Sequence, residues 1–250
     1  IKRNILCGRN FEYLSEDPVL AGELAADYIK GLQEEGSSAC LKHFAANNQE
    51  TDRLQINVEI EERVLREIYL KVFEIAVRKG KPDAVMCAYN KLNAIWCSEN
   101  PFLLDQILRK EWGFEGLMVS DWGAVHDAAR AVMAGMDLIM PHRDTVFQEI
   151  REGLENGKVT REALDRAVLH VLEWVGKEGR VQDLTYDRNS QHEEAICIAM
   201  ESMVLLKNEN EMLPLCSDRH QKIAVVGGYA PKSIEKRTGQ RGSISDGRIY

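Results

Sequence analysis

The chain has 250 residues, of which 44% are hydrophobic and 29% charged, values typical of a soluble globular protein and not of a disordered, collagen-like or coiled-coil chain. No apolar run reaches the roughly 18 residues that cross a bilayer, so the sequence predicts no membrane partner. The 32 basic and 40 acidic residues give a net charge of −8. This balance argues against nucleic acid as a partner and favours a neutral or cationic small molecule.

The six cysteines are scattered along the chain. Because none forms a Cys-x-x-Cys pair and no histidines cluster beside them, the sequence predicts neither a metal site nor a disulfide framework. Cys40 and Cys87 lie within apolar runs, as small buried side chains do. This usage favours a reducing compartment, and we predict a cytoplasmic location.

Four short apolar runs, each ending in polar residues or proline, predict buried parallel strands. They span residues 38–41, 84–88, 117–120 and 137–140, and the residues that follow them are Lys42-His43, Tyr89-Asn90, Asp121 and Pro141. Amphipathic helical stretches alternate with them, at residues 17–35, 59–79, 100–112 and 125–134. The alternation predicts an α/β fold with right-handed crossovers. Polar strand ends are typical of (β/α)8 barrels, and four units are too few to close one. We therefore predict the C-terminal part of a TIM-like barrel.

After Pro141 the pattern becomes helical. Helices are predicted at residues 145–156 and 160–176, a polar linker at 177–190, a further helix at 193–207, and a strand with a glycine turn at 222–228. We therefore expect a partial (β/α)8 barrel catalytic domain (1–176), a linker with a connecting helix (177–215) and the beginning of an α/β sandwich domain (216–250).

Asp121 is the sharpest candidate for chemistry, because it follows a predicted strand and precedes Trp122, a flat surface on which a sugar ring can lie. Position alone leaves three roles open for this carboxylate: a nucleophile, a metal ligand or the N-cap of the next helix. Lys42-His43 follows another strand, where a lysine forms a Schiff base as in aldolases, donates to hydroxyl groups, or is simply solvated. Tyr89 follows a third, where a hydrogen-bonded turn is the plainer interpretation.

Five motifs then occur in one order along the chain. They are residues 8–18 (GRNFEYLSEDP), 42–50 (KHFAANNQE), 86–93 (MCAYNKLN), 119–124 (VSDWGA) and 201–208 (ESMVLLKN). Together they resemble the signatures of glycoside hydrolase family 3, and they fit its multidomain β-glucosidases best. The N-acetylglucosaminidases of that family follow Lys-His-Phe with a Pro-Gly-His loop, whereas this sequence continues with Ala45-Ala46, which disfavours that subfamily.

The resemblance assigns roles where the motifs match. Asp121 corresponds to the family's nucleophile, and Trp122 to a wall of the sugar pocket. Met86 and Tyr89 match residues beside the nucleophile, where a tyrosine hydroxyl orients the carboxylate.

Lys42, His43 and Arg3 match residues that bind sugar hydroxyls in the −1 subsite. The resemblance implies a retaining exo-glycosidase that acts on terminal non-reducing β-D-glucosyl residues through a covalent glycosyl-enzyme on Asp121, with β-glucosides as substrates and no metal or organic cofactor. A β-xylosidase or another exo-glycosidase of the family, a non-catalytic sugar-binding remnant and a Schiff-base aldolase on Lys42 stay open as alternatives.

Two residues of the family pattern fall outside the five motifs. The aspartate that grips the outer sugar hydroxyls corresponds to a position upstream of Ile1, and the acid/base glutamate to a position past Tyr250. We therefore interpret the chain as a fragment and expect it to be inactive by itself. The oligomeric state is not predicted.

Overall fold

The computed structural model describes residues 1–177 and 185–215, which fall into two units. The first holds the described residues up to 177 and the second holds residues 185–215, and each is described by itself. Within these ranges, no helix combines the length and the apolar character that crossing a membrane requires.

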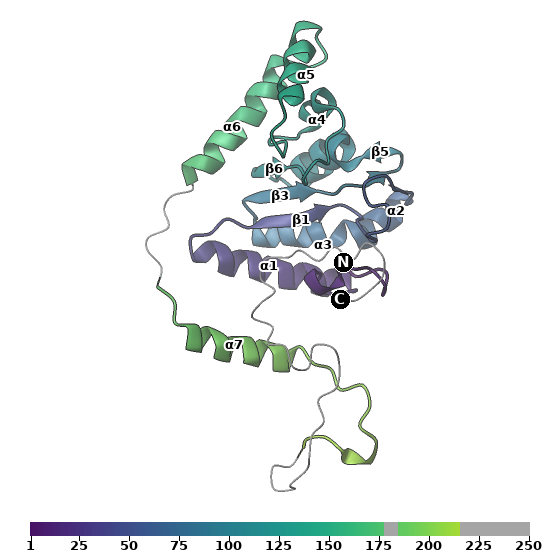
Figure 1. Ribbon diagram of the computed structural model, residues 1–250, viewed down its shortest axis with the longest axis vertical. Helices are drawn as coiled ribbons and strands as arrows, with labels where there is room; N and C mark the ends of the chain where they lie inside the picture. Colours follow the sequence, from purple (N-terminus) through teal and green to yellow (C-terminus); the bar gives the residue numbers. More distant parts are fainter. Residues whose placement is uncertain (178–184, 216–250) are drawn as a thin grey trace. The chain divides into compact units, whose positions relative to one another are not determined.

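The first unit is built on a parallel sheet whose strands follow one another in chain order (Figure 1). Strand β1 (Cys40–Phe44) pairs with β3 (Ala84–Cys87), which pairs with β6 (Leu117–Val119). A parallel bridge then joins Val119 to Leu138. The four predicted strands are thus confirmed as three strands and one bridge, and the predicted α/β class with them.

Helices lie between the strands, as the alternation predicts. Helix α1 (Pro18–Glu34) precedes β1, and the side chain of Asp17 accepts hydrogen bonds from the first-turn amides. The helical run before β3 divides into α2 (Glu62–Val64), η2 (Leu65–Tyr69), α3 (Lys71–Ile75) and η3 (Ala76–Gly80). Segment η5 (Phe102–Glu111) precedes β6, and α4 (Ala128–Ala134) follows it.

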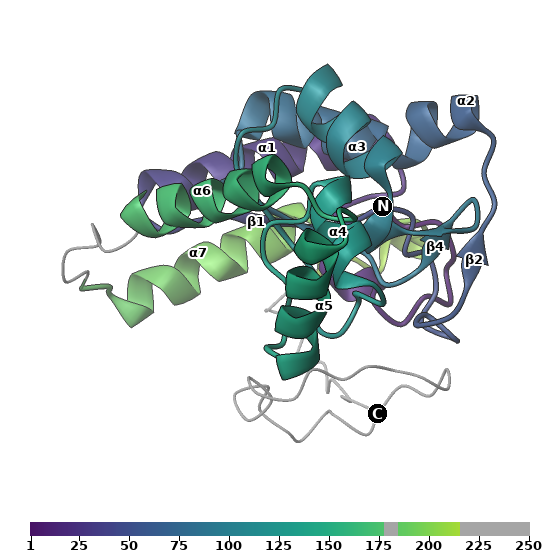
Figure 2. The ribbon, with the colours of Figure 1, turned by 90° about the horizontal axis from the view of Figure 1, so that it is seen from above.

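Helices α1 and α3 lie against each other, as Figures 1 and 2 show. The approach is close because α1 carries Gly22 at the contact. A Cβ atom at this position would lie only 2.7 Å from the Cβ of Ile75. Any other residue would force the helices apart, so glycine fixes how closely α1 covers this part of the core.

Phe44, at the end of β1, anchors the sheet in the core. It is fully buried, and its ring makes edge contacts with Phe73 and Trp112 at centroid distances of 5.1 and 5.8 Å. The pairing of β1 with β3 shifts register between Leu41 and Phe44, and the peptide bonds before His43 and after Phe44 are cis. Aromatic packing therefore holds the strand end that carries the polar residues.

The structure contains a second, small sheet that the sequence does not predict. Its strands are β2 (Asn57–Val58), β4 (Lys91–Leu92) and β5 (Ile95–Trp96), in the order β2-β4-β5. Each has two residues, too few to show an alternating pattern. The turn between β4 and β5 has positive φ angles at Asn93 and Ala94, and alanine is an uncommon residue in such a turn.

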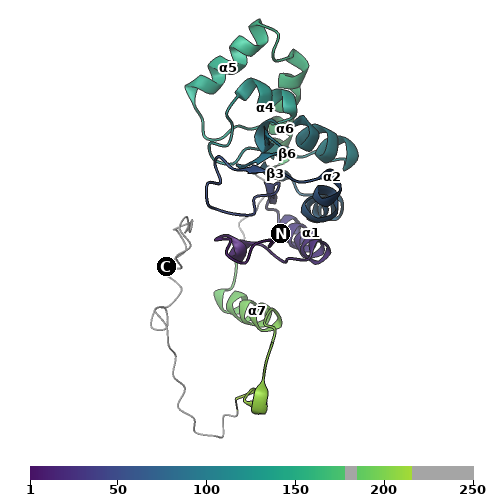
Figure 3. The same cartoon turned by 90° about the vertical axis from the view of Figure 1, so that its right-hand side faces the viewer.

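Helices α5 (Asp144–Glu155) and α6 (Arg161–Lys177) confirm the two predicted after Pro141. Both contact α4, which lies between β6 and α5 (Figure 3). His170 of α6 also contacts the buried carboxylate of Asp137, with Nδ1 2.9 Å from Oδ1.

In the second unit, α7 (Arg188–Glu201) replaces the helix predicted at residues 193–207, and a short turn, η6 (Glu209–Glu211), follows. Both predicted helix boundaries, and the predicted end of the linker at residue 190, are wrong. The helix begins earlier because Asp187 caps it, accepting a hydrogen bond from Asn189 N, and it ends where Ser202 Oγ donates to Ile198 O. The strand predicted at 222–228 lies outside the described residues.

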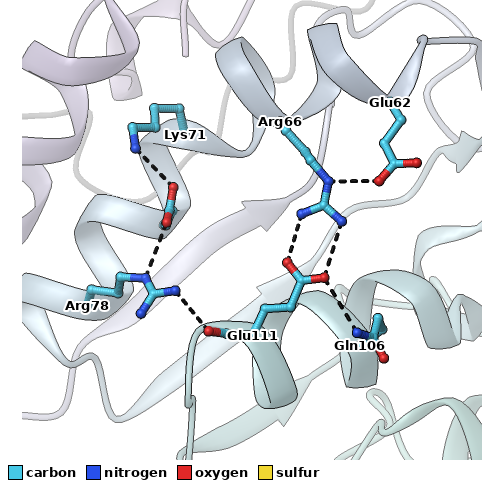
Figure 4. A network of polar contacts seen from close by, with 7 residues as sticks. Glu62, Arg66, Lys71, Arg78, Gln106 and Glu111 are labelled. Carbon is cyan, nitrogen blue, oxygen red and sulfur yellow. Dashed lines mark hydrogen bonds and ion pairs between the residues drawn. The ribbon is translucent and has the colours of Figure 1, made fainter.

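A polar network joins η5 to the preceding helical run (Figure 4). The two terminal nitrogens of Arg66 donate to the two carboxylate oxygens of Glu111 at 2.7 and 3.2 Å, and Arg66 Nε donates to Glu62. Arg78 reaches the Glu111 carbonyl at 2.8 Å. The hydrogen bond from Arg66 lowers the pKa of Glu111 below its ordinary value. Since a bidentate pair is stronger than an ordinary surface pair, this network stabilises the contact between the two helical segments.

Replacing Glu111 by Gln should loosen this contact. We expect a loss of about 0.5–1 kcal/mol, seen as a roughly two- to fivefold faster amide exchange across η5 in the complete protein. Because the folded-state pKa of Glu111 is lowered, its stabilisation is present above the ordinary carboxyl pKa and is lost as pH falls through the lowered value. The difference between wild type and variant should therefore shrink in acid.

Glu115→Gln provides the control, because Glu115 is exposed and makes no ion pair among the described residues. Equal exchange in wild type and Glu111→Gln at neutral pH would show that the network contributes nothing.

Candidate functional site

The polar ends of three strands meet at one edge of the sheet. Lys42 and His43 lie near the end of β1, Tyr89 follows β3, and Asp121 follows β6. Because the strands are parallel and paired in the order β1-β3-β6, their carboxyl ends lie side by side. The structure therefore brings these four predicted site residues to the same edge.

Asp121 is buried, with 8% of its surface exposed, and its own turn holds its carboxylate. Oδ1 accepts a hydrogen bond of 2.7 Å from Trp122 N, and the Asp121 carbonyl accepts one from Ala124 N at 3.1 Å. Gly123 in this turn has φ +81°, a left-handed conformation that favours glycine. The turn leaves Oδ2 to face His43.

His43 meets Asp121 with Nε2 3.4 Å from Oδ2. Its side chain is 2% exposed. Burial, and next the positive charges of Arg9, Lys42 and Arg53, together lower the pKa of His43 from 6.5 to about 2. The imidazole is therefore neutral at neutral pH, so its contact with the Asp121 carboxylate is not an ion pair.

Tyr89 and Trp122 lie at the same edge. The Tyr89 hydroxyl donates to Trp122 O at 3.1 Å. Burial, and next the negative charge of Asp121, raise the pKa of Tyr89 to about 12, so this hydroxyl keeps its proton. Trp122 is 63% exposed, so its ring is accessible from solvent. Met86 is half-buried on β3, paired with Val119 of β6.

Glu12 joins two cations beside β1. It ends the turn η1 (Asn10–Glu12), which follows Arg9. Its Oε2 lies 2.9 Å from Lys42 Nζ, and its Oε1 accepts a hydrogen bond from Arg9 Nε. Burial raises the pKa of Glu12, but the hydrogen bonds from Lys42 and Arg9 outweigh burial and hold it below its ordinary value. Glu12 therefore stays ionised at neutral pH and fixes both cations.

Arg53 is the third cation, and it comes from the loop after β1. Its Nη1 lies 2.6 Å from Glu50 Oε2, and its guanidinium carbon stands 5.0 Å from the centre of the Tyr89 ring. The sequence analysis missed Arg9, Glu12, Glu50 and Arg53, because it looked for chemistry at strand ends. The sequence does contain one indication of them, because an arginine and a glutamate lie three positions apart in both Arg9–Glu12 and Glu50–Arg53.

Together these residues form what we name the strand-end cluster. Its members are Arg9, Glu12, Lys42, His43, Glu50, Arg53, Tyr89, Asp121 and Trp122.

Arg3 lies elsewhere. Its guanidinium carbon stands 5.4 Å from the centre of the Tyr69 ring, and its Nε contacts the Tyr69 hydroxyl at 3.4 Å. Within the described residues, Arg3 makes no hydrogen bond or ion pair with the strand-end cluster. Its predicted role in hydroxyl binding therefore has no geometric support of the kind that Arg9 and Arg53 have.

A hollow of about 520 Å³ lies between α1 and β1, but it is mainly apolar. Tyr28, Ile29 and Leu41 are among its lining residues, and it shares Glu12 and Lys42 with the cluster. The charged side chains that line this hollow, Glu12 and Lys42, are thus members of the cluster as well.

The cluster places one central carboxylate among a neutral imidazole, a tyrosine hydroxyl and three cations. Such donors suit a polyhydroxylated ligand, and the carboxylate can serve as a nucleophile or an electrostatic stabiliser. In the part of the chain that the structure describes, no three histidine, cysteine or acidic side chains are grouped as metal ligands.

The chain matches known proteins over most of its length. The family described as "Glycosyl hydrolase family 3 N terminal domain" matches residues 1–174. The thermostable beta-glucosidase B of Acetivibrio thermocellus is 49% identical over 235 residues, which cover 93% of this chain and 31% of that protein. The exo-alpha-(1->6)-L-arabinopyranosidase of Bifidobacterium breve is 44% identical over 240 residues, which cover 92% of this chain and 32% of that protein.

Among solved structures, beta-glucosidase 3B from Thermotoga neapolitana in complex with alpha-D-glucose superposes with a TM-score of 0.81 at 47% identity. The match covers 86% of this chain and 32% of that one. The chain thus spans about a third of the length of the relatives that it matches.

The neutral state of His43 can be tested by NMR. In the complete protein labelled on histidine, the His43 ring signals should not shift between pH 8 and pH 4, because the folded-state pKa lies well below this range. Since the unfolded chain takes up the proton near pH 6.5, this group lowers the free energy of unfolding as pH falls below that value. His43→Gln assigns the signal by its loss, and a titration midpoint between pH 5 and 7 would contradict the prediction.

Proposed function

Because the chain belongs to glycosyl hydrolase family 3, we propose that it carries the nucleophile of a retaining β-glucosidase, and that this nucleophile is Asp121. One observation carries the proposal: a buried carboxylate at a strand end, held by its own turn and faced by the neutral His43. The β-glucosidase relatives, and the solved complex of one of them with glucose, support the substrate class.

The chemistry follows from the carboxylate. In a retaining glycosidase one carboxylate attacks the anomeric carbon, and a second carboxyl group protonates the leaving oxygen. Asp121 forms the glycosyl ester as the bond to the leaving oxygen breaks. Water then attacks the same carbon and gives a proton to the second carboxyl group, now ionised, while the bond to Asp121 breaks and the sugar leaves with its configuration retained. We do not assign the second carboxyl group to a residue of this chain.

The other members of the cluster bind the sugar. Lys42, Arg9 and Arg53 supply charged donors, and His43 supplies a neutral one, so the hydroxyl groups beside the anomeric carbon accept several hydrogen bonds. Bonds that strengthen as the oxocarbenium-like transition state forms lower the barrier, whereas equally strong bonds in the ground state do not. The exposed Trp122 ring offers an apolar face for the sugar ring.

A second candidate has support from one comparison. The exo-alpha-(1->6)-L-arabinopyranosidases resemble the chain almost as closely, so a pyranoside without a hydroxymethyl group, such as an arabinopyranoside or a β-xyloside, is the alternative substrate. The same nucleophile would serve. Comparing kcat/KM of the complete protein for aryl β-D-glucoside, β-D-xyloside and α-L-arabinopyranoside decides between them.

We also propose that β1, β3, β6 and the segment around Leu138 are consecutive units of a (β/α)8 barrel, with the cluster at the carboxyl ends of its strands. Their parallel pairing in chain order and the likeness to the Thermotoga enzyme support this. Residues 216–250, where the sequence predicts the beginning of an α/β sandwich domain, lie outside the described residues.

Replacing Asp121 by Gly in the complete protein should lower kcat on an aryl β-glucoside at least ~10³-fold, the scale of losing a covalent catalyst. Azide can fill the space and attack the anomeric carbon, so it should restore part of the activity and give a glycosyl azide of inverted configuration. Asp144→Gly is the control, because the Asp144 side chain is 96% exposed at the start of α5. Near-normal turnover of the Asp121 variant would remove this residue from the role.

Replacing Arg53 and Arg3 separately tests which of the two arginines binds the substrate. Arg53→Met should lower kcat/KM for the preferred glycoside by roughly 10- to 100-fold, because it removes hydrogen bonds from a charged donor. Arg3→Met should leave kcat/KM within about twofold of wild type if Arg3 only packs on Tyr69. The reverse order of effects would restore the role that the sequence predicts for Arg3.

A further inference from the structure

Glu50 is a buried acid that the proposed mechanism does not use. Its side chain is only 4% exposed, and it lies in the loop after β1. A carboxylate in such a place is costly unless a cation or hydrogen bonds compensate it. One oxygen, Oε2, is paired with Arg53 Nη1 at 2.6 Å, while Oε1 is buried and has no partner among the described residues. Glu50 therefore needs Arg53 more than the exposed acids of the helices need their partners.

A series of contacts leads from Glu50 through Arg53 and Tyr89 to the turn that carries Asp121. With Nη1 held by Glu50, the guanidinium stands over the Tyr89 ring, and the Tyr89 hydroxyl donates to Trp122 O, beside Asp121. A guanidinium has five N–H donors in a fixed plane, so fixing one nitrogen also sets the directions of the others. The donors that Glu50 does not use remain available to a ligand.

Glu50 also contributes charge where cations crowd together. The positive charges of Arg9, Lys42 and Arg53 all lower the pKa of His43. Burial lowers the pKa of Arg9, but the hydrogen bond and charge of Glu12, with a smaller contribution from the charge of Glu50, raise it above its ordinary value. Without Glu50, the repulsion between these cations would favour a conformation of Arg53 turned away into solvent.

We propose that Glu50 is a positioning residue for catalysis, which holds the guanidinium of Arg53 in the orientation that binds a sugar hydroxyl next to Asp121. The inference rests on the proposed glycosidase function and extends it to a residue that does not touch the substrate. The competing interpretation is that Glu50 and Arg53 only staple the loop through their spacing of three residues.

Kinetics of the complete protein separate these interpretations. Glu50→Ala should lower kcat/KM for an aryl β-glucoside by roughly 10-fold or more, as removal of a charge-assisted hydrogen bond does. Glu50→Gln keeps an oxygen that accepts from Nη1, so it should lose less than Glu50→Ala. If Glu50→Ala does not fold, as judged by circular dichroism, the comparison of Glu50→Gln with wild type decides alone.

A double-mutant cycle tests whether Glu50 acts through Arg53. The double variant of Glu50→Ala and Arg53→Met should be no slower than Arg53→Met, because Glu50 has nothing left to position. Glu74→Ala is the matched control: Glu74 also pairs with a cation three residues away, Lys71 at 3.0 Å, and it lies on α3. The control should combine additively with Arg53→Met.

A further measurement uses aryl glucosides that each lack one hydroxyl group. If Glu50 and Arg53 only stabilise the loop, the loss of kcat/KM caused by each missing hydroxyl should be the same in the variants as in wild type. One deoxy analogue should lose less kcat/KM, relative to the parent glucoside, in Arg53→Met than in wild type. The same analogue should also lose less in Glu50→Ala. The positioning role would be overturned if the losses of kcat/KM in Glu50→Ala and Arg53→Met were additive. It would also be overturned if the deoxy analogues lost as much kcat/KM in Glu50→Ala as in wild type. If the wild-type protein does not hydrolyse glycosides at all, both this inference and the proposed function fail, whereas normal turnover by both Glu50 variants overturns the inference alone.

Discussion

The parallel pairing of β1, β3 and β6 is the constraint on which the rest of the site depends. Parallel strands place their carboxyl ends at one edge, so His43 and Asp121, which are 78 positions apart in the sequence, come within 3.4 Å. The fully buried Phe44 follows His43 directly, and its packing on Phe73 and Trp112 prevents the strand end from moving without disturbing the core. The position of His43 is therefore set by hydrophobic packing as much as by hydrogen bonds.

Charge is the second requirement, because most of this site is removed from water. The cluster contains three cations, Arg9, Lys42 and Arg53, and three carboxylates, Glu12, Glu50 and Asp121, while His43 is neutral. Two of the carboxylates hold the cations directly, and Asp121 is held by its own turn instead. The carboxylate proposed as nucleophile is thus the one that no cation binds directly within the described residues, which leaves its Oδ2 available for chemistry.

The strand ends could be predicted from the sequence, and the cluster around them could be predicted only in part. Lys42, His43, Tyr89 and Asp121 follow apolar runs, and such runs show in a sequence because a buried strand must be apolar throughout. Arg9 and Arg53 come from loops, where no periodicity indicates the direction of a side chain, and Arg3 could not be told from them by spacing. The strands of the small sheet and the start of α7 were missed because two-residue pairings and single-residue caps produce no pattern.

The protonation states found here also restrict how the proposed reaction responds to pH. The pKa of His43 is lowered to about 2 and that of Tyr89 is raised to about 12, so neither group changes charge across the range in which a protein remains folded. Glu12 is held ionised, since its pKa lies below its ordinary value. A general acid, by contrast, must lose its proton within the working range in order to donate it efficiently. Neither limb of an activity profile would then arise from His43 or Tyr89. His43 and Tyr89 therefore keep the same protonation state beside Asp121 throughout the working pH range, and Glu12 stays ionised at neutral pH.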